Sequence, residues 1–522
     1  MVKPLSASLK KIARGAIIVM AGLIGCNLLQ FVARLIIARY GLEANYGVFS
    51  IALVMLNLAM VLSSLGLQWG ATRFIAHCAA RGDSSGVKST VMSSIQLASI
   101  SSVIVALILF LSADLLANNV FRMPDAAVAL KIFAAGVPFI TLVNILAAIF
   151  LGFNRVEPQV FFQYLMLNGV FCTLLGLSVL SGLSFTSIFY SYLVSIVIAF
   201  IGLVIYSRKK LREIPEMAMA IASRSIKKEI LAFSFPLLGN ALFSLIISWS
   251  DTLMMGFFRT AGEVGLYNSA YPLAQFIVMP IAALTFIYTP VASGLYSTDS
   301  LVELRRTFKV ITKWLVSLTL PLFMILCFYP EIVITLFFGE EYIGAAPALR
   351  ILAAGFMVNN FLGPNGPLLI AVGEAVFLFW CGLVSAIANI GLCIILIPKF
   401  GMMGAATASV SSMVLGNILP VIKLFRSHRA HPFSLNLIKP LLASVILTLV
   451  FQFVLSKFFM LDWWAIPIVF VIYYVIYAAA TYLTRSFYDE DLSLVLLIAK
   501  RLGLPEGRWE DKLKAFFHSG RK

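Results

Sequence analysis

Runs of about 20 mainly apolar residues, separated by short polar segments, recur along the whole chain. A helix of that length crosses a hydrocarbon core of about 30 Å. Counting the runs predicts about fourteen spans, centred near residues 26, 57, 101, 140, 170, 195, 243, 277, 319, 359, 387, 412, 450 and 473. The pattern predicts an all-α integral membrane protein.

Composition supports this class. Of the 522 residues, 61% are hydrophobic and only 12% are charged, with a mean hydropathy of +0.99. The formal net charge of +16 would indicate a nucleic-acid partner in a soluble domain. Here the basic residues lie in loops between the spans, so membrane topology explains them and no nucleic-acid partner is expected.

The basic residues also predict the orientation. With a cytoplasmic N-terminus, roughly thirty of the 39 Lys and Arg residues fall in the cytoplasmic loops and tail. The opposite loops carry acidic residues such as Glu43, Asp125 and Glu263. We therefore expect a multi-pass protein of the cytoplasmic (inner) membrane with both termini in the cytoplasm.

The largest basic loop divides the chain. The expected parts are an N-terminal lobe of six helices (1–206), a basic cytoplasmic linker (207–229), a C-terminal lobe of six helices (230–425), two extra spans (426–484) and a cytoplasmic tail (485–522). The basic linker can also contact anionic membrane lipids, although orientation alone accounts for it.

The two lobes show an internal repeat. The segments are "ARLIIARYGLEANYGVFS" (33–50) and "DTLMMGFFRTAGEVGLYNSAYP" (251–272). Aligning Gly47 with Gly265 also aligns Phe49 with Tyr267. The copies begin an even number of spans apart, so they have the same membrane orientation. Parallel repeats of this kind are related by an axis along the membrane normal, with the substrate site at their interface.

The first segment, continued as "SIALVMLNLAMVLSSLGLQWGATRFIA", resembles the polysaccharide flippase family of the multidrug, oligosaccharidyl-lipid and polysaccharide exporter superfamily. The second lobe adds "SDTLMMGFFRTAGEVGLYNSAYPLAQF", "LFFGEEYIGAAPALRILAAG" and "IPKFGMMGAATASVSSMV". The resemblance covers about residues 10–425. The last two spans resemble an extra pair that many polysaccharide flippases carry.

The resemblance implies a function. Such a flippase turns a polyprenyl-pyrophosphate-linked oligosaccharide from the cytoplasmic to the outer leaflet by alternating access, for O-antigen or exopolysaccharide synthesis. Its expected partners are this lipid-linked substrate, the membrane lipids, and a polysaccharide polymerase and glycosyltransferases.

Arg34 is a charged residue within a predicted span. A charge near the bilayer centre costs about 2.5–3.5 kcal/mol on insertion scales, so Arg34 should face a cavity or a partner. A guanidinium can bind phosphate oxygens with two hydrogen bonds. Alternatively, Arg34 and Arg39 extend to the outer interface.

Asp251 is an acidic residue within span seven. It is a candidate for pairing with Arg34 across the lobe interface, which would close one face, or for binding a coupling cation. A position at a hydrated helix end is the alternative.

Polar amides recur within the spans. Asn27, Gln30 and Arg34 are spaced by three and four residues, so they share one helix face. Each amide could instead join helices, at about 0.6 kcal/mol. The expected substrate cavity comprises Asn27, Gln30, Arg34, Arg39, Asn240, Asn268, Gln275, Asn359 and Asn360.

Enzyme chemistry has little support in the sequence. No P-loop is present. His428 and His431 have helical spacing but no carboxylate or thiol nearby in sequence, so we expect no metal site and no cofactor.

Three other functions compete with the flippase reading. A cation-coupled drug exporter of the same superfamily would share the two lobes. A lipid II flippase is disfavoured because the first lobe offers mainly Arg34 for its cavity. A membrane glycosyltransferase or polymerase would need catalytic carboxylates or a large loop on one face, and the outer loops are short.

Overall fold

The computed structural model describes residues 3–212, 226–434, 438–458 and 465–483. Within these ranges every regular element is a helix, which confirms the all-α prediction. The chain folds as two compact units, Met1–Asn268 and Ser269–Lys522.

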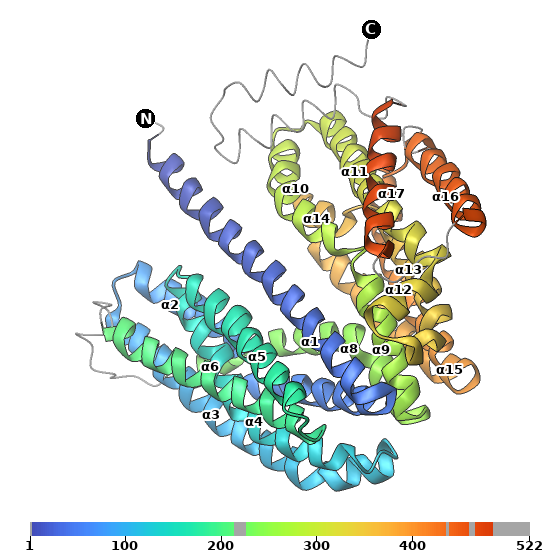
Figure 1. The fold of residues 1–522 in the computed structure, drawn as a ribbon. Coiled ribbons are helices and arrows are strands. Elements are labelled where there is room, and N and C mark those ends of the chain that lie inside the picture. Colours follow the sequence, from blue (N-terminus) through green and yellow to red (C-terminus); the bar gives the residue numbers. More distant parts are fainter. Residues whose placement is uncertain (1–2, 213–225, 435–437, 459–464, 484–522) are drawn as a thin grey trace. The chain divides into compact units, whose positions relative to one another are not determined.

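The first unit is a helical bundle (Figure 1). Its elements are α1 (Lys3–Ser64), α2 (Leu67–Ala80), α3 (Ser84–Leu115), π-helical η1 (Leu116–Val120), α4 (Ala126–Gly152), π-helical η2 (Gln159–Met166), α5 (Leu167–Leu180), α6 (Thr186–Arg212), α8 (Lys227–Phe258) and the first part of α9 (Ala261–Gln275). Helix α4 is central because it contacts α1, α2, α3 and α6.

Helix α1 contains two predicted spans. Its 62 residues are interrupted at Leu42, where φ is 58° and ψ is 178°. This residue follows Gly41, at the break that the hydropathy pattern shows between the first two apolar runs. The kink at Leu42 therefore divides α1 into the first two predicted spans.

Apolar side chains of α2, α3, α4 and α6 form the core of the first unit. Leu67, Ile75, Val91, Phe150 and Leu203 are all buried there. Ile230 of α8 belongs to the same cluster. Outward-facing apolar residues such as Ile100, Leu107 and Leu111 of α3 are more than half exposed, as lipid-facing positions should be.

The second unit contains the remaining helices. They are α10 (Met279–Ser297), α11 (Leu301–Phe328), α12 (Pro330–Phe337), 3₁₀-helical η3 (Glu340–Ala345), α13 (Ala346–Phe361), α14 (Asn365–Ala371), α15 (Ala375–His428), α16 (Ile438–Phe458) and α17 (Ala465–Leu483). A kink at Gly401, where φ is 57°, divides α15 into two spans. Tyr288, Phe308, Ile311 and Leu368 lie in the core of this unit.

The length and apolar character of the helices are those of a multi-pass membrane protein. Eight stretches of the described residues are long and apolar enough to cross a membrane, and the bent α8 makes a ninth. Two of the eight, Val19–Ser64 and Ala375–His428, are 46 and 54 residues long, so each contains two crossings of about 20 residues. With α9–α10, α16 and α17, the helices are consistent with about fourteen spans.

The division into units differs from the lobe boundary expected at the basic linker. Helix α8 follows that linker in sequence, yet it packs against α1, α2 and α3. Close packing explains this, because a Cβ at Gly66 or Gly70 would overlap the backbone or side chain of Ser234. The proposed lobes stay a sequence-based division, and the expected tail, 485–522, lies outside the described residues.

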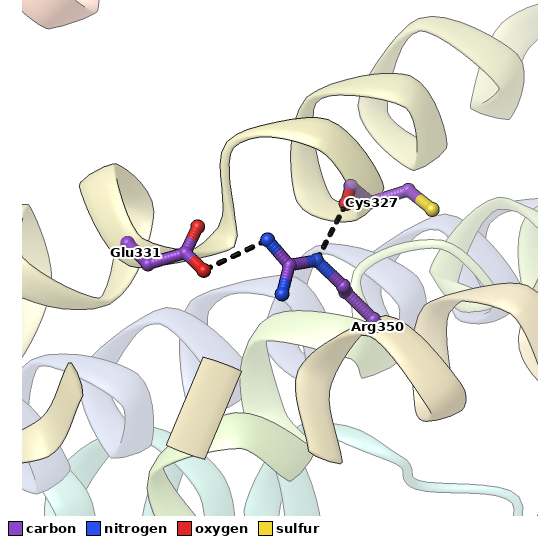
Figure 2. A network of polar contacts seen from close by, with 3 residues as sticks. All are labelled: Cys327, Glu331 and Arg350. Carbon is purple, nitrogen blue, oxygen red and sulfur yellow. Dashed lines mark hydrogen bonds and ion pairs between the residues drawn. The ribbon is translucent and has the colours of Figure 1, made fainter. Parts of the chain in front are cut away.

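Polar contacts fix helix ends in both units. In the first, Asp83 caps α3, since its Oδ1 accepts from the main-chain N–H of Gly86 at 2.9 Å. This hydrogen bond, with a second from Ser85, holds the pKa of the Asp83 carboxyl below its usual value. In the second, Arg350 donates to the carbonyl of Cys327 at 3.1 Å and pairs with Glu331 at 2.7 Å (Figure 2), joining α13 to the end of α11.

Candidate substrate-translocation site

One side of α1 combines exposed amides with a cation. Asn27 and Gln30 are exposed and Arg34 is half-buried. Within the described residues, the Arg34 side chain makes no hydrogen bond or ion pair. Its charge acts on the hydroxyls of Tyr46 and Tyr192. The guanidinium therefore retains its donors for a ligand, as a phosphate-binding residue requires.

Helix α5 and the preceding π-helix complete this face. Asn168 donates to the sulfur of Cys26 at 3.4 Å, and Gln30 donates to the same sulfur at 3.5 Å. Tyr164 accepts from Gln159 at 3.3 Å. These five residues lie on α1, on η2 or at the start of α5, and π-helical turns in α-helices occur frequently at functional sites.

The sequence did not single out Asn168, Tyr164 or Tyr192. Asn168 could have been found as a further amide within an apolar span. The tyrosines could not, because a tyrosine in a membrane span carries no signal of its own and only the fold brings these two near α1.

A second polar group surrounds Asp251 and is buried. Asp251, Thr252, Tyr267 and Asn268 are each at most 5% exposed. The Asp251 carboxylate accepts from the main-chain N–H of Thr252 at 2.8 Å and from the hydroxyl of Tyr267. Its charge is thus satisfied by hydrogen bonds, which a buried carboxylate needs.

Tyr46 links this group to α1. Its hydroxyl donates to the main-chain carbonyl of Asn268 at 3.1 Å, and the Asn268 amide oxygen accepts from Thr252 at 3.4 Å. Hydrogen bonds therefore connect Tyr46 through Asn268 and Thr252 to Asp251. Pairing between Arg34 and Asp251 stays a prediction.

Near Tyr46, the second span and the start of α9 approach each other closely at two glycines. A Cβ at Gly47 would overlap the carbonyl oxygen of Ala261, and a Cβ at Gly265 would overlap the carbonyl oxygen of Glu43. The two contacts are equivalent under the repeat alignment, which pairs Gly47 with Gly265 and therefore Glu43 with Ala261. We call this contact the glycine crossing.

The remaining predicted cavity residues are dispersed. Arg39 and Gln275 are exposed, Asn359 is half-buried, and Asn240 lies in α8 at a position whose side chain is not described. Asn360 is fully buried in the second unit, where it donates to the Ile277 carbonyl at 2.8 Å and to Thr319 at 3.0 Å. This bonding joins α13 to α11 and to the break between α9 and α10.

The described residues contain no group of three or more His, Cys, Asp and Glu side chains that could hold a metal ion. Cys26, Cys78, Cys172, Cys327, Cys381 and Cys393 are all free thiols.

Comparison with known proteins places the chain in a family. The family described as "Polysaccharide biosynthesis protein" matches residues 12–294, more than half of the chain. Stage V sporulation protein B of Bacillus subtilis is 23% identical over 78% of this chain and 82% of its own length. The probable flippase AglR of Haloferax volcanii is 27% identical over 54% of this chain and 58% of its own length.

Other curated relatives match over shorter stretches. Teichuronic acid biosynthesis protein TuaB of Bacillus subtilis is 29% identical over 29% of this chain, and the match covers 32% of TuaB. The chain thus matches about a third of that relative.

Solved structures share the fold. A lipid II flippase MurJ in an inward closed conformation has a TM-score of 0.69 at 16% identity, over 88% of this chain and 97% of its own. An inward-facing MATE transporter of the MOP superfamily has a TM-score of 0.62 at 17% identity, over 77% of this chain and 94% of its own. The shared fold and the family match over residues 12–294 confirm the resemblance to polysaccharide flippases, and the chain belongs to the polysaccharide biosynthesis protein family.

Proposed function

We propose that this protein is a flippase that moves a polyprenyl-pyrophosphate-linked oligosaccharide across the cytoplasmic membrane by alternating access, for surface polysaccharide synthesis. The observation that carries the proposal is the α1 face, where Arg34 lies beside Gln30 with no ion-pair partner among the described residues. A guanidinium that keeps its donors can bind pyrophosphate, and nearby amides can hydrogen-bond sugar hydroxyls.

Relatives support the coarse function. Two matched proteins of Haloferax volcanii are named as a probable flippase and a probable low-salt glycan biosynthesis flippase. Neither name is that of an enzyme, and we propose that this chain likewise moves its substrate without changing it covalently.

The glycine crossing supports alternating access. It packs the start of the second span (43–50) directly against the start of α9. With cytoplasmic termini, both segments lie at the outer surface. Small residues let the two helix backbones approach this closely, so the contact forms only when the two segments come together. We propose that it closes the outer side while the substrate enters from the cytoplasm.

Asp251 has two proposed roles, closing the outer side or coupling transport to a cation. Both act through the same buried group, since Tyr267 and Thr252 orient its carboxylate. Protonation or cation binding at Asp251 would weaken its bond to Tyr267, which lies two residues after Gly265.

Gene deletion tests the function. We expect full-length lipid-linked oligosaccharide to accumulate in the cytoplasmic leaflet of spheroplasts and surface polysaccharide to be lost. Wild-type protein should restore both, Arg34→Ala should not, and Arg34→Lys should restore them in part because it keeps the charge but loses the bidentate donors. Arg81→Ala, at an exposed residue between α2 and α3, is the matched control and should restore both.

Other outcomes identify the competing functions. Normal glycan together with sensitivity to dyes or drugs would indicate a drug exporter. Cell lysis with blocked wall synthesis would indicate lipid II flipping. Sugar transfer by the purified protein would indicate a glycosyltransferase.

A further inference from the structure

A pocket of about 470 Å³ lies in the first unit beside the glycine crossing. Three segments form it: the start of the second span, the loop that follows η1, and the turn between α8 and α9. These segments are far apart in sequence, and each follows or precedes a span at the end opposite to the basic loops. The pocket therefore opens on the proposed outer side.

The pocket has an apolar floor and a charged rim. Val48, Phe121 and Met123 are buried beneath it, while Phe257 and Phe258 lie edge to face at 4.9 Å on one wall. The rim carries two guanidiniums and two carboxylates, those of Arg122, Arg259, Asp125 and Glu263. The formal charges of the rim cancel.

Arg122 is held in an unusual conformation. Its φ is 54°, in the left-handed region that non-glycine residues seldom adopt. Within the described ranges, the side chains of Arg122 and Asp125 form neither hydrogen bonds nor ion pairs. Local strain of this kind gathers at binding sites, and here it places an available donor group and an available acceptor group at one opening.

The lining discriminates between ligands. A pyrophosphate would meet two carboxylates, and a polyprenyl chain would leave the Arg122 guanidinium and the Asp125 carboxylate without hydrogen-bond partners, since Arg259 and Glu263 already pair with each other at 3.9 Å. A sugar unit suits both parts of the pocket, because its hydroxyls accept from guanidinium and donate to carboxylate while its C–H faces rest on apolar side chains. The volume lies within the range of about 300–1,000 Å³ typical of small-molecule sites.

We propose that this pocket binds a saccharide unit of the translocated glycan on the outer side of the membrane. The assignment of the bound saccharide to the translocated glycan rests on the proposed function. Ala261 lines the pocket and also forms the glycine crossing, so the pocket is complete only while Gly47 and Gly265 are packed together. Bound saccharide therefore favours the outward-closed state.

Cysteine labelling tests the pocket. Ala44 lines it and is exposed, so Ala44→Cys, in a background without the native cysteines, should react with a membrane-impermeant maleimide in right-side-out vesicles. The probes are cellobiose, diacetylchitobiose and hyaluronan disaccharide. We expect at least one to slow labelling severalfold, and to leave unchanged the labelling of Ser184→Cys, an exposed control in the loop before α6.

Two further variants connect protection to the rim. Arg122→Gly suits a positive φ and so preserves the fold, yet it removes the guanidinium and should abolish protection. Asp125→Ala should do the same. Equal labelling rates with and without all three saccharides would overturn the proposal, as would protection that survives Arg122→Gly.

Labelling requires no transport, so the two proposals fail separately. Lost surface polysaccharide after gene deletion, with no protection at Ala44→Cys, would leave the flippase and remove the pocket. Protection with unchanged glycan after deletion would leave a saccharide site on a protein with another function.

Discussion

At the residue scale, the central feature is a buried carboxylate with a donor for each oxygen. Asp251 lies in a span and is only 3% exposed. A carboxylate at such a position is costly unless it is hydrogen-bonded. Thr252 supplies a main-chain N–H and Tyr267 supplies a hydroxyl. Tyr267 occupies the position that Phe49 holds in the first repeat, so the hydroxyl is present only in the copy that has the acid.

Tyr267→Phe should therefore destabilise the protein. The change leaves one carboxylate oxygen of Asp251 without this donor, and we expect the free energy of unfolding to fall by about 1–3 kcal/mol, measured by denaturant unfolding in detergent. Tyr288→Phe is the matched control. The Tyr288 hydroxyl is buried with no hydrogen-bond partner among the described residues, so its removal should cost nothing.

A double-mutant cycle completes this test. In the Tyr267→Phe background, Asp251→Asn should cost less than it does alone, because the lost interaction is shared. Additive costs would show that the two side chains do not depend on each other.

At the element scale, helix packing depends on the glycines, where no side chain keeps two backbones apart. The second span and the start of α9 approach so closely that main-chain carbonyls occupy the place of a Cβ at Gly47 and Gly265. Small residues permit such approaches between membrane helices. The helices also carry the Tyr46–Asn268 hydrogen bond, so displacement of one contact disturbs the other.

Gly47→Ala and Gly265→Ala should each separate these helices. Overpacking of this kind costs about 1–3 kcal/mol, and we expect lower thermal stability together with reduced surface polysaccharide. Gly391→Ala is the matched control, because Gly391 is helical and a Cβ there meets nothing within 4 Å. Unchanged stability in Gly47→Ala would contradict the described packing.

At the scale of the whole molecule, hydropathy predicted the helices because each span must satisfy its own backbone and expose apolar side chains to lipid. The repeat alignment matched Gly47 with Gly265 as equivalent positions, but it did not predict that their helices pack against each other. The partners of Asp251 were not predicted, since Tyr267 is sixteen residues away and meets it only after α8 and α9 turn back. Asn360 was expected in a cavity, yet it bonds the Ile277 carbonyl, and no sequence pattern marks that carbonyl as needing a donor.

The transport cycle should stop when the crossing is locked. A Cβ at Gly262 would lie 3.5 Å from the Cγ of Glu43, which suits a disulfide between Glu43→Cys and Gly262→Cys. In a background without native cysteines, we expect oxidation to block appearance of the lipid-linked oligosaccharide in the outer leaflet and reduction to restore it. Each single cysteine should transport normally under both conditions. Full transport by the oxidised double variant would refute opening at this crossing.

The two reciprocal contacts of the glycine crossing bear on the origin of the two-repeat chain. Gly47 touches the carbonyl of Ala261, and Gly265 touches that of Glu43, so each partner supplies the same surface to the other. This is the rule for an isologous interface in a two-fold homodimer. A half-length chain carrying only one copy of the motif would hold both halves of the contact. The crossing thus retains, inside one polypeptide, the self-complementary surface by which two identical ancestral subunits could have assembled.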